Sequence, residues 1–297
     1  MSSPRFTRSP LFGMALVGFG AIGFGIMPLF IRMAYEEGQT PLSLLVWRFA
    51  IAAACCLPFL PAILKQRRDF VFAFIAGAAY MSSMLFYFIA LQYLTVALTV
   101  LILFTYPLFT ILLGWLAFGE KLTRANLIAA ALVFIAAALI LSPDAVAGAP
   151  LLPVLLCFIP PTAYSLFIHI AARRLSHIIV PVRLGGVFIG GFLAMLGLCL
   201  IWEGGVIVPT SFKAWGAAAA LAILSTFGAL GLLLLGAPIA GPERSAIAGA
   251  GELITSLLVG LLAFAEPISW PMLAGAGLIL LAIVVSARGT PKIPGEP

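Results

Sequence analysis

Apolar stretches of roughly 20 residues alternate with short polar clusters along the whole chain. As a helix rising about 1.5 Å per residue, such a stretch crosses the ~30 Å hydrocarbon core of a bilayer. The short clusters between them leave no room for a soluble domain. The pattern predicts an all-α polytopic membrane protein with ten transmembrane helices, at 11–33, 42–64, 70–92, 94–118, 122–142, 151–172, 180–202, 213–236, 243–264 and 268–288.

One segment of the chain occurs twice. Ile111–Glu120 reads ILLGWLAFGE and Leu257–Glu266 reads LLVGLLAFAE, with six of ten positions identical at an offset of 146 residues. An offset of half the chain predicts two five-helix repeats, residues 1–148 and 149–297. Five spans is an odd number, so the second repeat must cross the membrane in the opposite sense. Inverted repeats are typical of transporters that alternate around a central site.

Composition and charge agree with a membrane location. The chain is 63% hydrophobic and 9% charged, with a mean hydropathy of +1.21, which is too apolar for a soluble protein of 297 residues. With the N-terminus in the cytoplasm, thirteen Lys and Arg residues fall on the cytoplasmic side and only Arg32 and Lys213 outside. This bias predicts a multi-pass protein of a bacterial-type inner membrane with both termini cytoplasmic. It also accounts for the net charge of +6 without a nucleic-acid partner.

Two motifs carry a resemblance to a known family. The second span begins PLSLLVWRF, which includes Arg48, and the fourth ends YPLFTILLGWLAFGEKLT, which includes Pro107. With ten spans in two halves, the chain resembles the EamA domain of the drug/metabolite transporter superfamily. The resemblance covers nearly the whole chain and is weaker in the second half, where Leu253 stands in place of Pro107 and Ala265 in place of Gly119. It implies export of small metabolites, and amino-acid exporters are prominent among bacterial members.

Two ionisable residues lie well inside predicted spans. Arg48 is the seventh residue of the second span, and Glu252 is the tenth residue of the ninth. A charge inside a bilayer costs on the order of a few kcal/mol unless it faces water or a partner, so both are candidates for a binding site. Arg48 would hold a substrate carboxylate, and Glu252 an amine or a coupling proton. The structural alternatives are an ion pair between them, or an arginine that braces loop carbonyls.

Tyrosines and a serine complete the predicted binding site. Tyr80, Ser83 and Tyr87 follow i, i+3, i+7 spacing and so share one face of the third span. The 146-residue offset aligns Tyr106 with Glu252, so these two residues would approach one central space from opposite halves. The alternative for the third span is aromatic belting at the membrane interface together with interhelical hydrogen bonds.

Prolines interrupt three predicted spans: Pro28 the first, Pro107 the fourth, and Pro160 with Pro161 the sixth. A proline removes a backbone N–H and leaves a carbonyl free one turn earlier. Such carbonyls line cavities in transporters. We therefore expect hinges at these prolines, simple packing kinks being the alternative. Tyr164, just past the proline pair, is a further candidate for the wall of the cavity.

Two glutamates and a pair of glycines have structural interpretations. Glu120 and Glu266 close the two copies of the repeat at predicted membrane edges, where helix ends and loops can satisfy a carboxylate. Gly186 and Gly190 form G-x-x-x-G in the seventh span, which predicts close contact with another helix.

These features predict a secondary transporter of the inner membrane that exports small metabolites, amino acids above all, by alternating access around a central cavity. Within transport the rivals are a lipophilic-drug exporter and a lipid-intermediate flippase. From another class, they are a non-transporting membrane protein and an intramembrane enzyme. The sequence has no HExxH, Walker loop, GxSxG or Cys/His zinc spacing, so we expect no enzyme, cofactor or metal. The predicted partners are a small-molecule substrate and the lipid bilayer. The sequence does not determine the substrate, the coupling ion, the direction of flux or the oligomeric state, which includes the possibility of a monomer.

Overall fold

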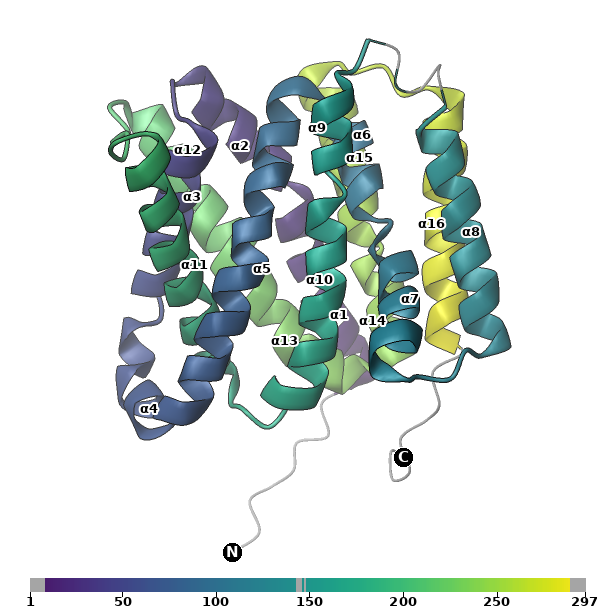
Figure 1. Cartoon of the computed structure of the whole chain (residues 1–297), viewed down its shortest axis with the longest axis horizontal. Helices are drawn as coiled ribbons and strands as arrows, with labels where there is room; N and C mark the ends of the chain where they lie inside the picture. Colours follow the sequence, from purple (N-terminus) through teal and green to yellow (C-terminus); the bar gives the residue numbers. More distant parts are fainter. Residues whose placement is uncertain (1–8, 143–145, 147, 289–297) are drawn as a thin grey trace, which may run out of the picture.

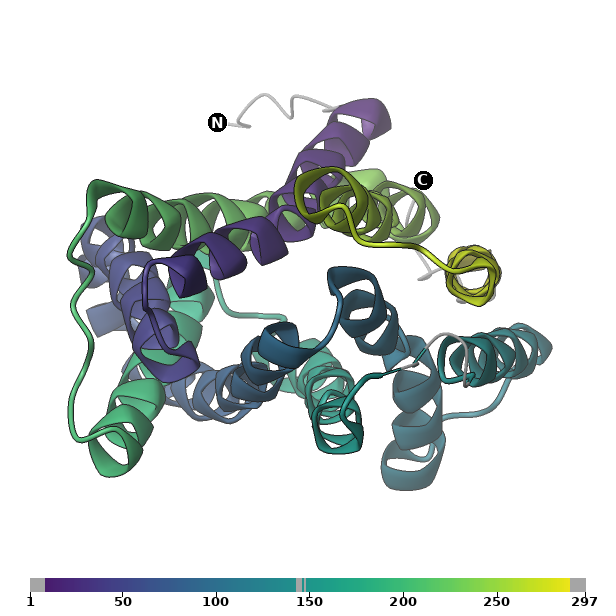
Figure 2. The same cartoon turned by 90° about the horizontal axis from the view of Figure 1, so that it is seen from above.

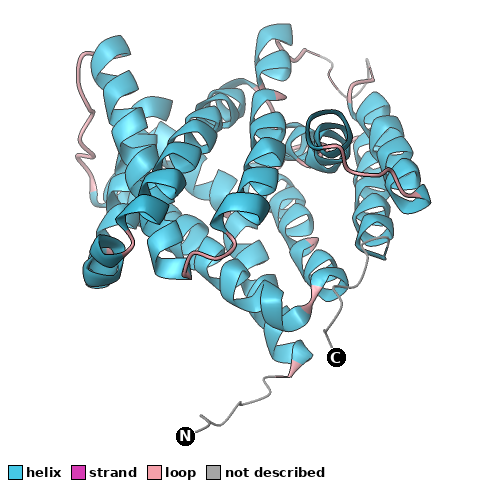
Figure 3. Ribbon diagram, turned by 60° about the horizontal axis from the view of Figure 1, so that its bottom comes forward, coloured by secondary structure: helices cyan, strands magenta, loops and turns pink. Residues whose placement is uncertain are grey.

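The computed structural model describes residues 9–142, 146 and 148–288. The described part of the chain is a bundle of helices joined by short loops and contains no strand (Figure 1, Figure 3). Its α-helices are α1 (Pro10–Gly25), α2 (Met27–Glu36), α3 (Pro41–Ala54), α4 (Leu60–Lys65), α5 (Arg67–Tyr93), α6 (Val96–Leu103), α7 (Tyr106–Phe118), α8 (Arg124–Ile140), α9 (Leu151–Leu156), α10 (Ile159–Ile170), α11 (Val180–Trp202), α12 (Phe212–Ala222), α13 (Ala229–Ala240), α14 (Pro242–Gly249), α15 (Gly251–Phe264) and α16 (Trp270–Arg288). A 3-10 turn, η1 (Leu57–Phe59), precedes α4, and two π-helical segments, η2 (Ala171–Leu175) and η3 (Ile223–Gly228), interrupt the later spans.

Within the described ranges, eight continuous helical stretches are long and apolar enough to cross a membrane. The bent pair of α3 with Leu57–Lys65 makes a ninth candidate. The shorter apolar helix α8 occupies most of the predicted run 122–142. Together these elements occupy all ten runs predicted from hydropathy, and the protein is an all-α, multi-pass membrane protein.

Apart from Arg48, the described lysines and arginines divide between the two faces of the bundle. α1 begins and α16 ends at the lower face in Figure 1, which we name the terminal face; the opposite one is the distal face. Arg32 and Lys213 lie near helix ends at the distal face. Of the cations predicted to be cytoplasmic, Arg5, Arg8 and Lys292 lie outside the described residues. The others lie near helix ends at the terminal face: Lys65, Arg67, Arg68, Lys121, Arg124, Arg173, Arg174, Arg183, Arg244 and Arg288.

Besides the bent pair of α3 with Leu57–Lys65, four spans are broken, into α1–α2, α6–α7, α9–α10 and α14–α15. The 146-residue offset of the repeat carries Val96–Leu103 onto 242–249, the bounds of α14, and carries α7 onto 252–264 within α15. The fourth and ninth spans are therefore broken at matching positions. The breaks lie at Ile26, at Phe104 and Thr105, at Cys157 and Phe158, and at Ala250.

Prolines account for three of these breaks. Pro28, Pro107 and the pair Pro160–Pro161 each lie in the first turn after a break. A proline is tolerated there because the first N–H groups of a helix have no intrahelical partner, and its fixed φ suits the helix. The break at Ala250 has no proline, and it lies between two glycines.

Small residues set the closest helix contact. α11 packs along α5 and α3, α1 along α13, and α16 along α8. A Cβ atom added to Gly186 would lie 2.5 Å from the Cβ of Ala73, and one on Gly190 would overlap the carbonyl oxygen of Phe74. The close contact predicted for this G-x-x-x-G is confirmed, with α5 as the partner helix. Viewed along the spans, α1, α2 and α12–α15 stand opposite α5–α7 and α10 (Figure 2).

Candidate functional site

A cavity of about 440 Å³ lies where the broken helices meet. Its volume is in the range of small-molecule sites, roughly 300–1,000 Å³. From the breaks the cavity continues past Ala237 to Ser245 and so extends toward the terminal face. Broken helices leave backbone groups without intrahelical partners, which suits such a cavity to a polar solute. The residues that line it at the breaks are Phe24, Met27, Leu103, Phe104, Tyr106, Gly249, Ala250 and Glu252.

Arg48 reaches this cavity from α3 and is held by Thr226. Its side chain is buried, and its Nε donates a hydrogen bond to the Thr226 hydroxyl at 2.7 Å. The guanidinium lies over the rings of Phe49 and Phe88, 5.3 and 5.5 Å from their centroids. Among the described residues its Nη1 is buried without a hydrogen-bond partner. Because a buried cation without a counter-ion is costly, this arginine is suited to hold an anionic group.

Glu252 faces the same cavity from the first turn of α15. The partial positive charge of a helix N-terminus favours a carboxylate there. Within the described part of the chain, Glu252 forms no hydrogen bond or ion pair, and no nitrogen of Arg48 lies within 4.0 Å of its oxygens. The ion pair considered as an alternative for these residues is therefore not present. One basic and one acidic side chain therefore line the same cavity, and they do not form an ion pair with each other.

Aromatic rings form one wall between these charges. Tyr80 of α5 stacks on Phe167 of α10 with centroids 4.9 Å apart, and lies 5.3 Å from Tyr164. Tyr164 also makes an edge contact with Tyr106 at 5.0 Å. All four rings line the cavity, so Tyr80, Tyr106 and Tyr164 lie where the sequence placed them. The wall can pack a ring or an aliphatic side chain and has hydroxyls at its edges.

Ser83 and Tyr87, two other predicted site residues, do not line this cavity. The hydroxyl of Ser83 donates to the Tyr80 carbonyl at 2.6 Å, and Tyr87 is only 1% exposed within the core. Both follow Tyr80 along α5 toward the distal face. Met84, one turn beyond Tyr80, lines the cavity instead.

Hydroxyl side chains satisfy carbonyls at the breaks. Ser256 donates to the Gly25 carbonyl at 3.1 Å, at the junction of α1 with α2. Ser165 donates to the carbonyls of Tyr106 and Pro161 at 2.9 and 2.7 Å. The four predicted hinge prolines themselves are not among the cavity-lining residues. They shape the cavity by ending helices beside it.

Thr226 is a cavity-lining residue, in contact with Arg48, that sequence reasoning missed. Its hydroxyl donates to the Leu221 carbonyl, five residues earlier, at 2.8 Å, which fits its position in the π-helical segment η3. The only sequence signal is the hydroxyl pair Ser225–Thr226 within the apolar run 213–236. The hydroxyl pair alone does not indicate which side chain it would meet.

Comparison with known proteins agrees with this architecture. Residues 11–142 match the EamA-like transporter family. The first half of this membrane protein is therefore an EamA-like transporter domain. The family belongs to the drug/metabolite transporter superfamily, as the motifs around Arg48 and Pro107 indicated. The match covers the first half of the chain, the half in which those motifs are clearer.

The whole chain also shares its fold with a solved crystal structure. The two superpose with a TM-score of 0.63 at 21% sequence identity, covering 92% of this chain and 96% of the other. At that identity the likeness shows the fold alone. No curated protein matches the sequence. Among the described residues no group of three or more His, Cys, Asp or Glu side chains is placed to hold a metal ion.

Proposed function

We propose that this membrane protein is a secondary transporter that moves a small zwitterion, an amino acid or a related metabolite, outward across the inner membrane. The observation that carries the proposal is the presence of Arg48 and Glu252 on one central cavity without an ion pair between them. A zwitterion supplies both missing counter-charges. In this proposal Arg48 binds the carboxylate, Glu252 binds the amine, and Tyr80, Tyr106 and Tyr164 contact the substrate's side chain.

The matched breaks support alternating access between two inverted halves, 1–148 and 149–297. A rocking motion needs hinges near the bound substrate, and the breaks of α1–α2, α6–α7 and α14–α15 contribute residues to the cavity wall. The proline-marked breaks of α1–α2, α6–α7 and α9–α10 are the proposed hinges. The concentration of Lys and Arg at the terminal face supports a cytoplasmic location for that face and therefore for both termini.

The proposal is tested by flux through the purified protein in liposomes. A panel of labelled amino acids is measured with and without an imposed pH gradient, and empty liposomes supply the background. Saturable flux of some members of the panel is the expected result, and its response to the gradient decides whether a proton is coupled. No flux above background, from protein shown to be folded and inserted, would overturn the amino-acid proposal.

A lipophilic-drug exporter or lipid-intermediate flippase is the second candidate. The observation in its favour is that apolar side chains, among them Leu230, Leu233 and Leu234 of α13, make up most of the cavity wall. The same liposomes distinguish it, because a lipophilic cation or a fluorescent lipid would then move while amino acids would not. A non-transporting protein or an intramembrane enzyme predicts no flux of any of these compounds, whereas the EamA-like transporter domain favours transport.

A further inference from the structure

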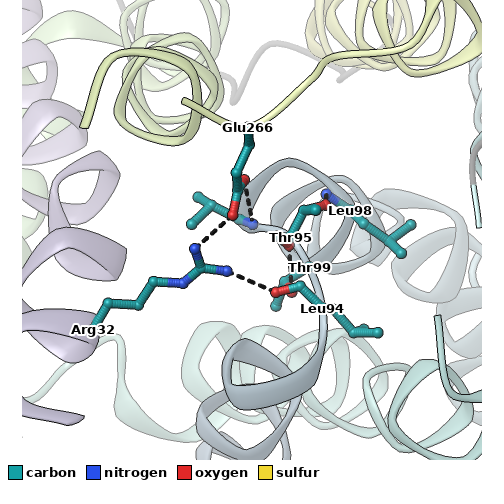
Figure 4. A network of polar contacts seen from close by, with 7 residues as sticks. Arg32, Leu94, Thr95, Leu98, Thr99 and Glu266 are labelled. Carbon is teal, nitrogen blue, oxygen red and sulfur yellow. Dashed lines mark hydrogen bonds and ion pairs between the residues drawn. The ribbon is translucent and has the colours of Figure 1, made fainter. Parts of the chain in front are cut away.

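A cluster of polar contacts joins three elements at the distal face (Figure 4). Arg32, at the end of α2, forms an ion pair with Glu266 at 2.6 Å and donates to the carbonyl of Leu94 at 2.8 Å. Glu266 in turn accepts the backbone N–H of Val96 at 2.8 Å. The side chains of Arg32 and Glu266 are 22% and 8% exposed, so water screens this pair less than a surface pair. The cluster ties α2 and the end of α15 to the turn between α5 and α6.

The other copy of the repeat forms a matching cluster at the terminal face. Glu120 pairs with Arg173 at 2.9 Å, and both side chains are about half exposed. The guanidinium of Arg173 lies 4.6 Å from the ring centroid of Phe118, as that of Arg32 lies 4.7 Å from Phe264. In each cluster an arginine from the first span of one half reaches the Phe-x-Glu end of the other half.

The local backbone explains why the two glutamates are placed alike. Each repeat helix ends in a left-handed residue, Gly119 with φ 66° and Ala265 with φ 49°. The N–H of the following glutamate then bonds the carbonyl of Gly114 or Gly260, at 2.9 and 3.1 Å. A Cβ atom on either of these glycines would lie within 3 Å of the glutamate carboxylate. The glycines therefore leave the space that each carboxylate occupies.

The two clusters differ in what surrounds them. At the distal face α15 packs against α6 and α2. By the repeat offset, α7 corresponds to α15, and α14 corresponds to α6. At the terminal face, however, α7 and α14 do not pack closely in the described structure, and residues of both helices line the cavity. The offset also carries Leu94–Val96 onto 240–242, where Pro242 has no N–H to donate. The terminal cluster therefore lacks the contacts to a neighbouring turn that complete the distal cluster.

We infer that these two clusters are the gates of the transport pathway. The Arg32–Glu266 cluster holds the distal gate shut in this state. Glu120 and Arg173 form the part of the terminal gate that is already in contact. The terminal gate closes when α14 approaches α7 and Arg173 reaches the carbonyl of Ala240. The inference rests on the proposed transport function, but its test needs no substrate.

The test measures access to the cavity from each face. Leu230→Cys places a thiol in the cavity wall, and a membrane-impermeant maleimide is added to one side of sealed vesicles of sorted orientation. The same protein without this thiol gives the background from the native cysteines. With both gates native, we expect the maleimide to react with this thiol when it is added on the terminal side. Arg32→Gln or Glu266→Gln should raise the rate from the distal side by about tenfold or more, the shift that ~1.4 kcal/mol produces in a two-state equilibrium.

Two further variants keep the inference falsifiable if loss of a charge impairs folding. Val96→Pro removes one donor to Glu266 without changing charge, and proline suits the first position of α6, where the preceding Thr95 is already extended. It should raise distal labelling less than the charge variants do. Lys213→Gln is the matched control, because it removes a distal charge whose ion pairs, with Glu36 and Glu37, include neither Arg32 nor Glu266. The inference is wrong if folded Arg32→Gln, Glu266→Gln and Val96→Pro proteins label at the native rate, or if Lys213→Gln raises labelling equally. If the gate variants change distal labelling as expected but the protein moves no solute, the proposed function is wrong and the inference about the gates stands.

Discussion

Thr226 fixes Arg48 at the cavity wall through one hydrogen bond, 2.7 Å from Nε to the threonine hydroxyl. The hydroxyl is itself anchored to the Leu221 carbonyl, so the guanidinium is held by a chain that ends in backbone. Its Nη1 is buried and has no hydrogen-bond partner among the described residues. This arrangement makes the orientation of Arg48, and not only its charge, a property that substitutions can test.

Thr226→Val should weaken substrate binding with little change in maximal flux. A hydrogen bond to a charged group contributes about 1.5–3 kcal/mol, so we expect KM to rise roughly tenfold to a hundredfold. Thr226→Ser keeps the hydroxyl and should restore KM to within about threefold of the native value, a fraction of that hydrogen-bond energy. Concentration-dependent flux in liposomes separates KM from maximal rate. Loss of maximal flux at unchanged KM would contradict a positioning role.

Glu252→Gln should weaken the binding of amino acids but not of the corresponding acids that lack the amine. If Glu252 binds the ammonium group, removing its charge weakens amino-acid binding by about tenfold or more and leaves the des-amino carboxylic acid unaffected. Competition of the two compounds against a labelled amino acid measures both effects in one experiment. A variant that binds amino acids normally but no longer responds to a pH gradient would assign Glu252 to proton coupling instead.

Tyr164→Ala should impair transport more than Tyr164→Phe. The ring contacts both Tyr80 and Tyr106, and each aromatic pair contributes about 0.5–1.5 kcal/mol beyond area burial. The hydroxyl of Tyr164 has no hydrogen-bond partner in the described structure, so the phenylalanine variant should keep flux within about twofold. Equal losses in the two variants would show that the hydroxyl, not the ring, contacts the substrate.

Gly190→Ala should destabilise the bundle, whereas Gly197→Ala in the same helix should not. A Cβ on Gly190 would overlap the Phe74 carbonyl, and forced overpacking costs about 1–3 kcal/mol. A Cβ on Gly197 meets nothing within 4 Å, and alanine is the better helix former by about 1 kcal/mol. Thermal unfolding in detergent compares the two midpoints. A midpoint for Gly190→Ala as high as that of Gly197→Ala would contradict the close α5–α11 contact.

The sequence by itself determined the helices, several of their breaks and the charge asymmetry. Hydropathy fixes the spans because backbone groups in hydrocarbon must bond within their own helix. Prolines fix three breaks because they cannot donate an N–H. The fourth break, at Ala250, follows from no proline and became visible only in the structure. The repeat predicted that Tyr106 and Glu252 lie on one central space, and both line the cavity.

Tertiary structure decided which side chains the cavity contains. Helical spacing places Tyr80, Ser83 and Tyr87 on one face of α5, but it does not say how far along that face the cavity extends. Packing at the distal face buries Tyr87 and leaves Tyr80 in the wall. The partnership of Arg48 with Thr226 joins residues 178 positions apart, and that of Arg32 with Glu266 joins residues from opposite halves. Such pairs depend on how the helices pack against one another, and no local pattern along the chain records that packing.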